Sequence, residues 1–160
     1  MRNLLLGLLC TMAFISCNDK LVYTQSKPTT DASWDQDELM KFTFMAPDTI
    51  QPHNLYFNIR NDDRFPYSNL FVIAALNTPK GETSVDTLEY EMARPDGTWL
   101  GKGQGSIKEN KLWFKEAMIF PNTGEYTLTL QHAMRKNGEV EGVVELPGIT
   151  DVGLEIEKQE

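Results

Sequence analysis

Short stretches in which apolar and polar residues alternate recur along most of the chain. A period of two places one set of side chains on each face of a strand, so the pattern predicts half-buried β-strands. One example is the run in which Leu55, Phe57 and Ile59 alternate with more polar neighbours. Similar alternation covers residues 39–44, 84–94, 111–120, 125–135 and 149–157. In 125–135 the inward set is Tyr126, Leu128, Leu130 and His132.

Several stretches depart from simple alternation. Residues 69–76 are nearly all apolar, which predicts a central strand covered on both faces. Residues 34–38 could form one helical turn, and Thr98–Leu100 a short strand. Residues 140–146 fit either an extra edge strand or a loop, and an edge strand could begin at Leu21 after a short polar tether.

Turn-forming residues separate these segments. Turns are expected at residues 78–81, 95–97, 121–124 and 136–138, each rich in Pro, Gly, Asn or Asp. About eight to ten short strands at fairly even spacing, with no convincing helix, predict an all-β antiparallel β-sandwich. The pattern does not decide between a jelly-roll and an immunoglobulin-like topology. With no linker inside the body, residues 34–160 are expected to be one domain.

The first residues carry a targeting signal. A short positive start precedes an apolar run from Leu4 to Ile15, which is too short to span a bilayer, and Ser16 and Cys17 follow it. This order predicts a lipoprotein signal peptide over 1–16, a lipid on Cys17, and a lipidated N-terminus, tether and candidate first strand over 17–33. The alternative is an ordinary secretory signal that happens to contain a cysteine. Because a bacterial lipoprotein carries more than one acyl chain, we expect a permanent anchor and no need for a further membrane-binding surface.

Charge and cysteine content narrow the classes of function. The chain has 15 basic and 23 acidic residues, and removal of Arg2 with the signal leaves 14 against 23, or −9. An acidic surface disfavours nucleic acid as a partner. Once the signal and its Cys10 are removed, Cys17 is the only cysteine left, which excludes a disulfide framework and a thiol nucleophile. Asp19 is the only acidic residue next to the cysteine that would carry the lipid. An acidic run there would suggest display on the cell surface, so a single acid favours the periplasmic side of the membrane.

Candidate catalytic and metal-binding groups do not converge. His53 and His132 are far apart in sequence, and each is expected to be a strand histidine satisfied by hydrogen bonds rather than a metal ligand. Glycines at 101, 103 and 105 lack both the phosphate-loop spacing and a following helix, so they predict a flexible hairpin or a bulge. A loop calcium site could draw on four aspartates, but these lack the dense Asp-x-Asp order: Asp62, Asp63, Asp86 and Asp96.

Three tryptophans could form a platform on which sugars stack, namely Trp34, Trp99 and Trp113. Aromatic residues in β-sandwiches more often fill the core or a hairpin. Exposure decides between the two, and the sequence does not give it. Two functions therefore compete with a structural one, a lipid-anchored glycan-binding sandwich and a surface hydrolase. We expect no catalytic residue, no metal and no cofactor.

Several blocks taken together resemble a known family. They are YSNLFV at 67–72, DTLEYEMA at 86–93, DGTWLGKG at 96–103, GEY at 124–126, QHAMR at 131–135 and GITDVGLEIE at 148–157. With the cysteine at 17, the chain resembles the GldH family of gliding-motility lipoproteins from about Leu21 to its end. Residues 136–146 are longer than this resemblance leads us to expect.

The resemblance implies a lipid-anchored envelope protein that is needed for gliding and grouped with the machinery of type IX secretion. It implies other gliding and secretion envelope proteins as partners, and a place at the outer membrane. We therefore expect a non-catalytic accessory or assembly component. The hairpin from Asp86 to Gly105 is a candidate docking face through Asp86, Trp99, Lys102 and Gly103, since tryptophan is a favoured interface anchor. The alternative is that this stretch only determines the fold.

Overall fold

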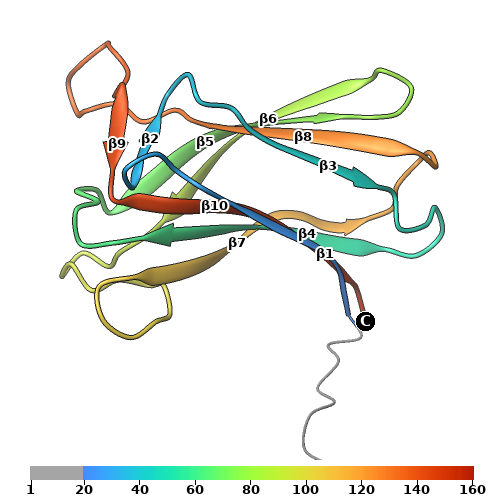
Figure 1. Ribbon diagram of the computed structural model, residues 1–160, viewed down its shortest axis with the longest axis horizontal. Coiled ribbons are helices and arrows are strands. Elements are labelled where there is room, and N and C mark those ends of the chain that lie inside the picture. Colours follow the sequence, from blue (N-terminus) through green and yellow to red (C-terminus); the bar gives the residue numbers. More distant parts are fainter. Residues whose placement is uncertain (1–19) are drawn as a thin grey trace, which may run out of the picture.

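The computed structural model describes residues 20–160 as two antiparallel sheets packed face to face, with a short ribbon at one end (Figure 1). One four-stranded sheet has the order β1 (Leu21–Pro28), β10 (Ile149–Lys158), β4 (His53–Asn61), β7 (Lys108–Met118). The other has the order β3 (Met40–Met45), β8 (Glu125–His132), β5 (Asn69–Asn77), β6 (Thr83–Glu91). The ribbon pairs β2 (Ser33–Asp35) with β9 (Glu145–Pro147). Residues 20–160 contain ten strands and no helix, so the predicted all-β sandwich is confirmed.

The core lies between the two sheets and follows the predicted alternation. On β3, Met40, Phe42 and Phe44 are buried while the residues between them are exposed. β8 and β10 turn their apolar sets inward in the same way, with Val152, Leu154 and Ile156 buried in β10. Each fully buried side chain of this kind contributes about 1.5–3 kcal/mol. Burial of these two inner faces therefore fixes which way every strand faces.

Strand β5 is an interior strand, as the sequence predicts, but it is covered on one face only. Leu70, Val72 and Leu76 are buried against the first sheet. The alternate residues Phe71 and Ile73 are half-buried on the outer face. The expectation of cover on both faces is wrong because the sandwich has two layers, and no third layer packs on this sheet in residues 20–160.

Residues 34–38 do not form the helical turn that was expected. Ser33–Asp35 is strand β2, in which Trp34 lies opposite Leu146 of β9. The indole is fully buried at this end of the sandwich, and its Nε1 donates to the Glu38 carbonyl at 3.0 Å. A single helical turn has little stability of its own, so burial of Trp34 determines the local structure. In 140–146 the chain is largely a loop, and Trp99 makes only one isolated bridge, to Ala93.

The strands connect at two opposite ends. What we call the entry end holds residue 20, where the chain enters β1, and the loops 46–52, 78–82 and 119–124; it lies to the right in Figure 1. Backbone hydrogen bonds join its parts, from Lys158 N to Lys20 O at 2.8 Å and from Gln159 N to Pro52 O at 3.0 Å. The far end holds the ribbon and the loops 62–68, 92–107 and 133–144.

The two open sides of the sandwich are closed by different chemistry. Between β1 and β3, the Tyr23 and Phe44 rings lie 5.4 Å apart. Between β6 and β7, the Tyr90 hydroxyl donates to the Trp113 carbonyl at 2.6 Å. This phenol is partly buried, and burial raises the pKa of Tyr90.

Candidate functional site

The segment between β6 and β7 forms a hairpin followed by a glycine-rich loop, both at the far end. A tight turn joins Arg94 to Thr98, with Arg94 N donating to the Thr98 carbonyl at 2.8 Å. Gly97 has a φ of 85°, which a residue with a side chain rarely adopts. The Asp96 carboxylate accepts from Thr98 N at 2.9 Å, and this bond lowers the pKa of Asp96. The predicted turn at 95–97 is therefore present, with Asp96 fixing its shape.

Trp99 lies on the return arm of this hairpin and is half-buried. Its ring centroid is 6.2 Å from that of Phe65, which is itself buried in the loop after β4. The neighbouring Leu100 N donates to the Met92 carbonyl at 2.9 Å. Trp99 thus packs the hairpin onto the far end of the sandwich while part of its surface stays accessible.

The three glycines that follow have different roles. A Cβ on Gly101 would come within 2.7 Å of the Asn110 amide oxygen. Gly103 has a φ of 148°, and a Cβ there would lie 2.5 Å from the Ile107 carbonyl oxygen. Gly105 also has a positive φ, but a Cβ there would meet nothing within 4 Å. A side chain at 101 would therefore displace the Asn110 amide, a side chain at 103 would meet backbone, and only the positive φ favours glycine at 105.

A lysine holds this loop closed. Lys108 Nζ donates to the carbonyls of Gly103 at 3.1 Å and Gly105 at 3.0 Å. The backbones of Lys102 and Glu109 also exchange two hydrogen bonds of 2.8 Å. The glycine-rich loop is thus tied to the start of β7 on both sides.

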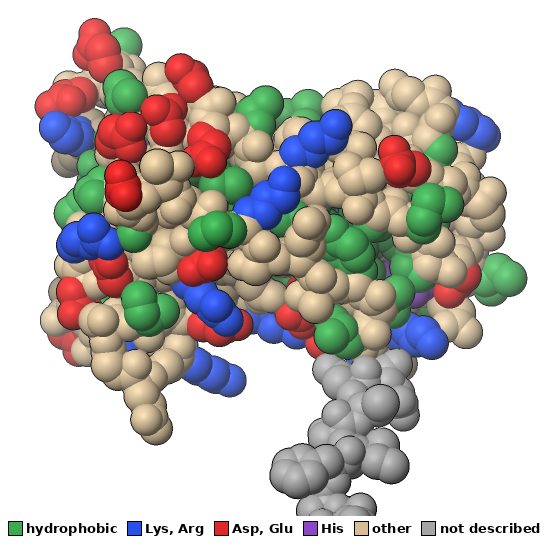
Figure 2. Space-filling view, in the orientation of Figure 1, with side chains coloured by type: hydrophobic (Ala, Val, Ile, Leu, Met, Phe, Trp, Pro, Cys, Tyr) green, Lys and Arg blue, Asp and Glu red, His purple; other side chains and the backbone are tan. Residues whose placement is uncertain are grey.

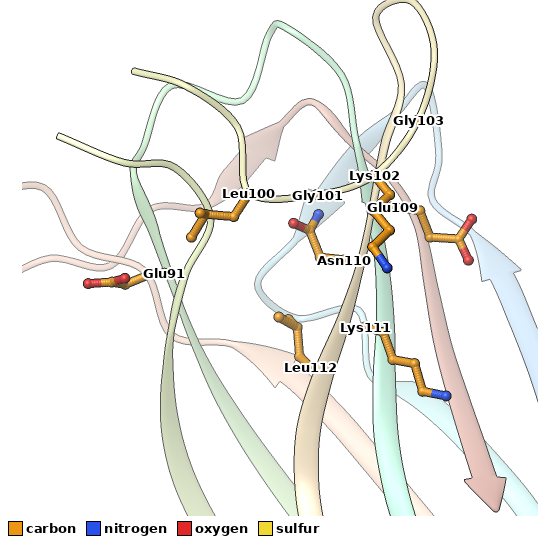
Figure 3. A pocket seen from close by; sticks show the side chains of 9 residues that line it. All are labelled: Glu91, Leu100, Gly101, Lys102, Gly103, Glu109, Asn110, Lys111 and Leu112. Atoms are coloured by element: carbon orange, nitrogen blue, oxygen red, sulfur yellow. The ribbon is translucent and has the colours of Figure 1, made fainter. Parts of the chain in front are cut away.

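A pocket of about 620 Å³ lies between this loop and β7 (Figure 3). Its lining combines apolar, charged and amide side chains from Glu91, Leu100, Gly101, Lys102, Gly103, Glu109, Asn110, Lys111 and Leu112. In Figure 3, Asn110 and Leu112 point from β7 toward the segment Leu100–Gly101, whereas Glu109 and Lys111 point to the other side of that strand. The pocket is therefore apolar and amide-lined within and charged at its rim.

The floor of the pocket contains a buried amide that the sequence reasoning missed. Asn110 Nδ2 donates to the Ile59 carbonyl at 3.1 Å and to the Asn61 side-chain oxygen at 2.9 Å. Asn61 is fully buried and Asn110 nearly so. The signal was present in the sequence, because Asn110 shares the strand parity of Leu112 and Phe114 and so had to face inward.

The structure separates Asp86 from the other three docking candidates. Asp86 lies on β6, five residues before its end, and its carboxylate is 2.8 Å from Lys115 Nζ across the seam between the sheets. Lys102 and Gly103 line the pocket, and Trp99 directly precedes the lining residue Leu100 in sequence. The structure thus places Lys102 and Gly103 together at the pocket, packs Trp99 on Phe65, and assigns Asp86 to closure of the sandwich.

Both histidines are buried, but their ring nitrogens lack the hydrogen bonds that we expected. Within residues 20–160 none of the four ring nitrogens makes a hydrogen bond of good geometry, and His53 Nε2 lies 3.8 Å from Asp48 Oδ2. His132 instead lies edge-on to Trp34 with 5.4 Å between ring centroids, and His53 lies 5.7 Å from Phe120. Burial is the largest cause that lowers the pKa of His132, and the backbone of Trp34 and Val144 opposes it. Both residues are strand histidines, as expected, and their rings pack mainly against aromatic side chains.

The three tryptophans do not share a surface. Trp34 is fully buried at the far end, Trp99 packs on Phe65, and only Trp113 is largely exposed, at 51%. Trp113 lies on the outer face of the first sheet, 4.5 Å from Tyr56. The three rings therefore do not form one platform, and of the three tryptophans only Trp113 offers a largely exposed ring.

The aspartates considered for calcium are mostly engaged elsewhere. Asp62 pairs with Arg64 at 2.6 Å, and both the hydrogen bond and the charge lower the pKa of Asp62. Asp86 and Asp96 have the structural roles given above. Across residues 20–160, no three His, Cys, Asp or Glu side chains cluster as a metal site requires. In the same range, no helix is long and apolar enough to cross a membrane. Cys17 lies outside the described residues.

Comparison with known proteins gives a consistent result. A family model described as GldH lipoprotein matches residues 21–156. A gliding motility lipoprotein GldH homolog of Christiangramia forsetii is 46% identical over 147 residues, which cover 92% of this chain and 90% of the relative. The gliding motility lipoprotein GldH of Flavobacterium johnsoniae is 41% identical over 153 residues, covering 96% and 94%.

Among solved structures, the VP2 subviral particle of infectious bursal disease virus aligns with a TM-score of 0.36 and 14% identity. The alignment covers 84% of this chain and 30% of the viral chain. This likeness is too slight to support an argument about function.

Proposed function

The chain belongs to the GldH family of gliding-motility lipoproteins, and from that premise we propose what it does. A lipid on Cys17 holds the sandwich at the periplasmic face of the outer membrane. There it serves the gliding apparatus, and the type IX secretion machinery grouped with it, as a non-catalytic accessory component. Family membership is the observation that supports this proposal most directly.

The anchor is consistent with the way the chain enters the fold. Cys17 is the only cysteine that remains after removal of the signal, and strand β1 begins four residues later at Leu21. Four residues span at most about 14 Å when fully extended. The entry end of the sandwich is therefore restricted to the neighbourhood of the membrane that holds the lipid.

A non-catalytic role is supported by the use of the charged side chains. Several acids and bases form structural pairs, such as Lys111 with Glu155 at 2.6 Å and Lys115 with Asp86 at 2.8 Å. The family and its two relatives are named as lipoproteins of gliding motility and not as enzymes. We infer that the protein acts through contacts with other proteins.

The pocket beside the glycine-rich loop is the surface we assign to partner docking. It opens at the far end, away from the point at which the lipid-bearing segment joins β1. Leu100 and Leu112 provide an apolar interior, and exposed Lys102 stands at the rim. Lys102 forms no ion pair within residues 20–160, so its ammonium is available to a carboxylate on a partner. The pocket thus fits an apolar side chain followed by an acidic one.

The test is capture of envelope partners with a matched pair of lysine variants. The tagged, lipidated protein is purified from membranes as wild type, Lys102→Ala and Lys80→Ala; Lys80 is an exposed lysine at the entry end. We expect gliding and secretion proteins to co-purify with wild type and Lys80→Ala, and to be lost with Lys102→Ala at an unchanged melting temperature. Equal capture by all three proteins would place docking elsewhere.

A lipid-anchored glycan-binding sandwich is the alternative function, and exposed Trp113 beside Tyr56 is the observation that favours it. A sugar would stack on the exposed ring of Trp113. Retention of an envelope polysaccharide by the wild type, lost with Trp113→Ala and kept with Lys102→Ala, would overturn the docking proposal.

A further inference from the structure

The entry end carries a group of exposed apolar side chains. They come from three separate segments, namely the start of β1, the end of β3 with its following loop, and the residue after β7. Ile50 is 82% exposed, Met45 66% and Ile119 53%, and Leu21 and Val22 are also exposed. In Figure 2 hydrophobic side chains project at the right-hand end, the end at which the chain enters β1. Exposed apolar groups gathered at one end of a soluble domain indicate a contact surface.

Backbone pairing shows that these segments are neighbours. His53 lies opposite Met118, so the loop that holds Ile50 adjoins the residue that follows β7. Ala46 N donates to the Gly124 carbonyl at 2.9 Å, which joins the same loop to the turn before β8. The Pro52 carbonyl accepts from Gln159 N, and the preceding Lys158 N donates to the Lys20 carbonyl. Ile50, Ile119 and the start of β1 thus belong to one surface.

The loop presents Ile50 outward in a fixed conformation. Asp48 Oδ1 accepts from Ile50 N at 2.8 Å and from Gln51 N at 2.7 Å, and these two bonds lower the pKa of Asp48. A capped turn of this kind exposes its tip without the support of a packed core. Because Asp48 already orders this turn, docking of the tip would lose less conformational entropy.

The far end also has exposed apolar residues, but in a different electrostatic setting. Val140 stands between Glu139 and Glu141, and Leu39 follows Glu38. Acidic side chains also crowd the ribbon and its loops, and they gather at the upper left in Figure 2. They include Asp31, Asp35, Asp37 and Glu145. At the entry end, Met45, Ile50 and Ile119 have no acidic residue immediately before or after them in sequence, although Asp48 caps the Ile50 turn and Glu125 pairs with Met45. Anionic lipid would repel the acidic cluster around the ribbon at the far end.

We propose that the entry end docks on the lipid surface, with Ile50, Ile119 and Met45 inserted among the headgroups beside the lipid on Cys17. This inference depends on the proposed lipid anchor. The short reach from Cys17 to Leu21 holds the tips within the interfacial zone of the bilayer. The lipid retains the protein, and the tips set its orientation, so the pocket at the far end points away from the membrane. This proposal departs from the expectation that the protein part needs no membrane-binding surface.

The test uses the absence of other cysteines in the mature protein. Ile50→Cys, Ile119→Cys and Val140→Cys are each labelled with an environment-sensitive fluorophore in the lipidated protein. Each is reconstituted in vesicles of phosphatidylethanolamine and phosphatidylglycerol, with or without quencher-bearing lipid. Val140, which is 79% exposed at the far end, is the matched control. We expect a blue shift and quenching for probes at 50 and 119, and an aqueous spectrum for the probe at 140.

Two further measurements complete the test. A probe at Met45→Cys should shift toward an aqueous spectrum when Ile50→Ser and Ile119→Ser are added, and should not shift with Val140→Ser. Intact mass measurement reports the acyl chains on Cys17. Acylated protein with aqueous probes at 50 and 119 would overturn docking alone. Protein without acyl chains would overturn the lipid anchor, and the docking inference with it.

Discussion

Substitution of Gly103 by alanine should damage the fold as well as any docking. The backbone φ of 148° at Gly103 lies in a region that residues with a Cβ adopt at a cost of about 1–3 kcal/mol. The added Cβ would also lie 2.5 Å from the Ile107 carbonyl oxygen, whereas carbon–oxygen contacts begin at about 3.3 Å. Together these effects should cost about 3–4 kcal/mol, which lowers the melting temperature by roughly 10 °C in a domain of this size.

Gly105→Ala is the matched control, because Gly105 lies in the same loop and also has a positive φ but lacks the close contact. Its φ of 76° is also positive, but a Cβ there would meet no atom within 4 Å. The left-handed conformation alone costs about 1–2 kcal/mol, or roughly 4 °C. Thermal unfolding followed by circular dichroism measures both variants. Equal losses for Gly103→Ala and Gly105→Ala would refute the close contact with Ile107 and show that the loop relaxes freely.

Three further outcomes follow from the geometry. Burial lowers the pKa of His132 below 6.5 in the folded state. The stability that neutral His132 contributes is therefore present above about pH 6.5 and is lost as the pH falls below that value. The drop in melting temperature between about pH 7.5 and 5.0 should accordingly be smaller in His132→Phe than in the wild type. Gly148→Ala should prevent stable folding, since its φ is 84° and a Cβ would lie 2.1 Å from Phe65 N; soluble yield and circular dichroism test this, and wild-type stability would contradict it. Tyr90→Phe removes the 2.6 Å hydrogen bond to the Trp113 carbonyl and should cost about 1 kcal/mol in denaturant unfolding; an unchanged midpoint would mean that this bond does not help to close the seam.

The sequence by itself determined the fold class and the facing of most strands. In β3, β8 and β10 a period of two assigns each side chain to the core or to solvent, and the structure agrees at Phe42, Leu128 and Leu154. The signal is strong because a shift of one residue would expose the whole buried set. The family resemblance was likewise carried by short blocks of sequence, and the comparisons confirm it.

Only the tertiary structure decided what the special residues do. Trp34 shows no alternation that predicts a strand, yet burial at the open end of the sandwich places it in β2. Asp86 and Lys102 are both docking candidates in the sequence. In the structure Asp86 closes the seam with Lys115, whereas Lys102 stands at the pocket rim. Likewise, only the folded structure shows that Ile50 and Ile119 are exposed at the same end of the sandwich. Local pattern reports which face a residue takes, whereas its neighbours come from strands distant in sequence, and packing alone brings those strands together.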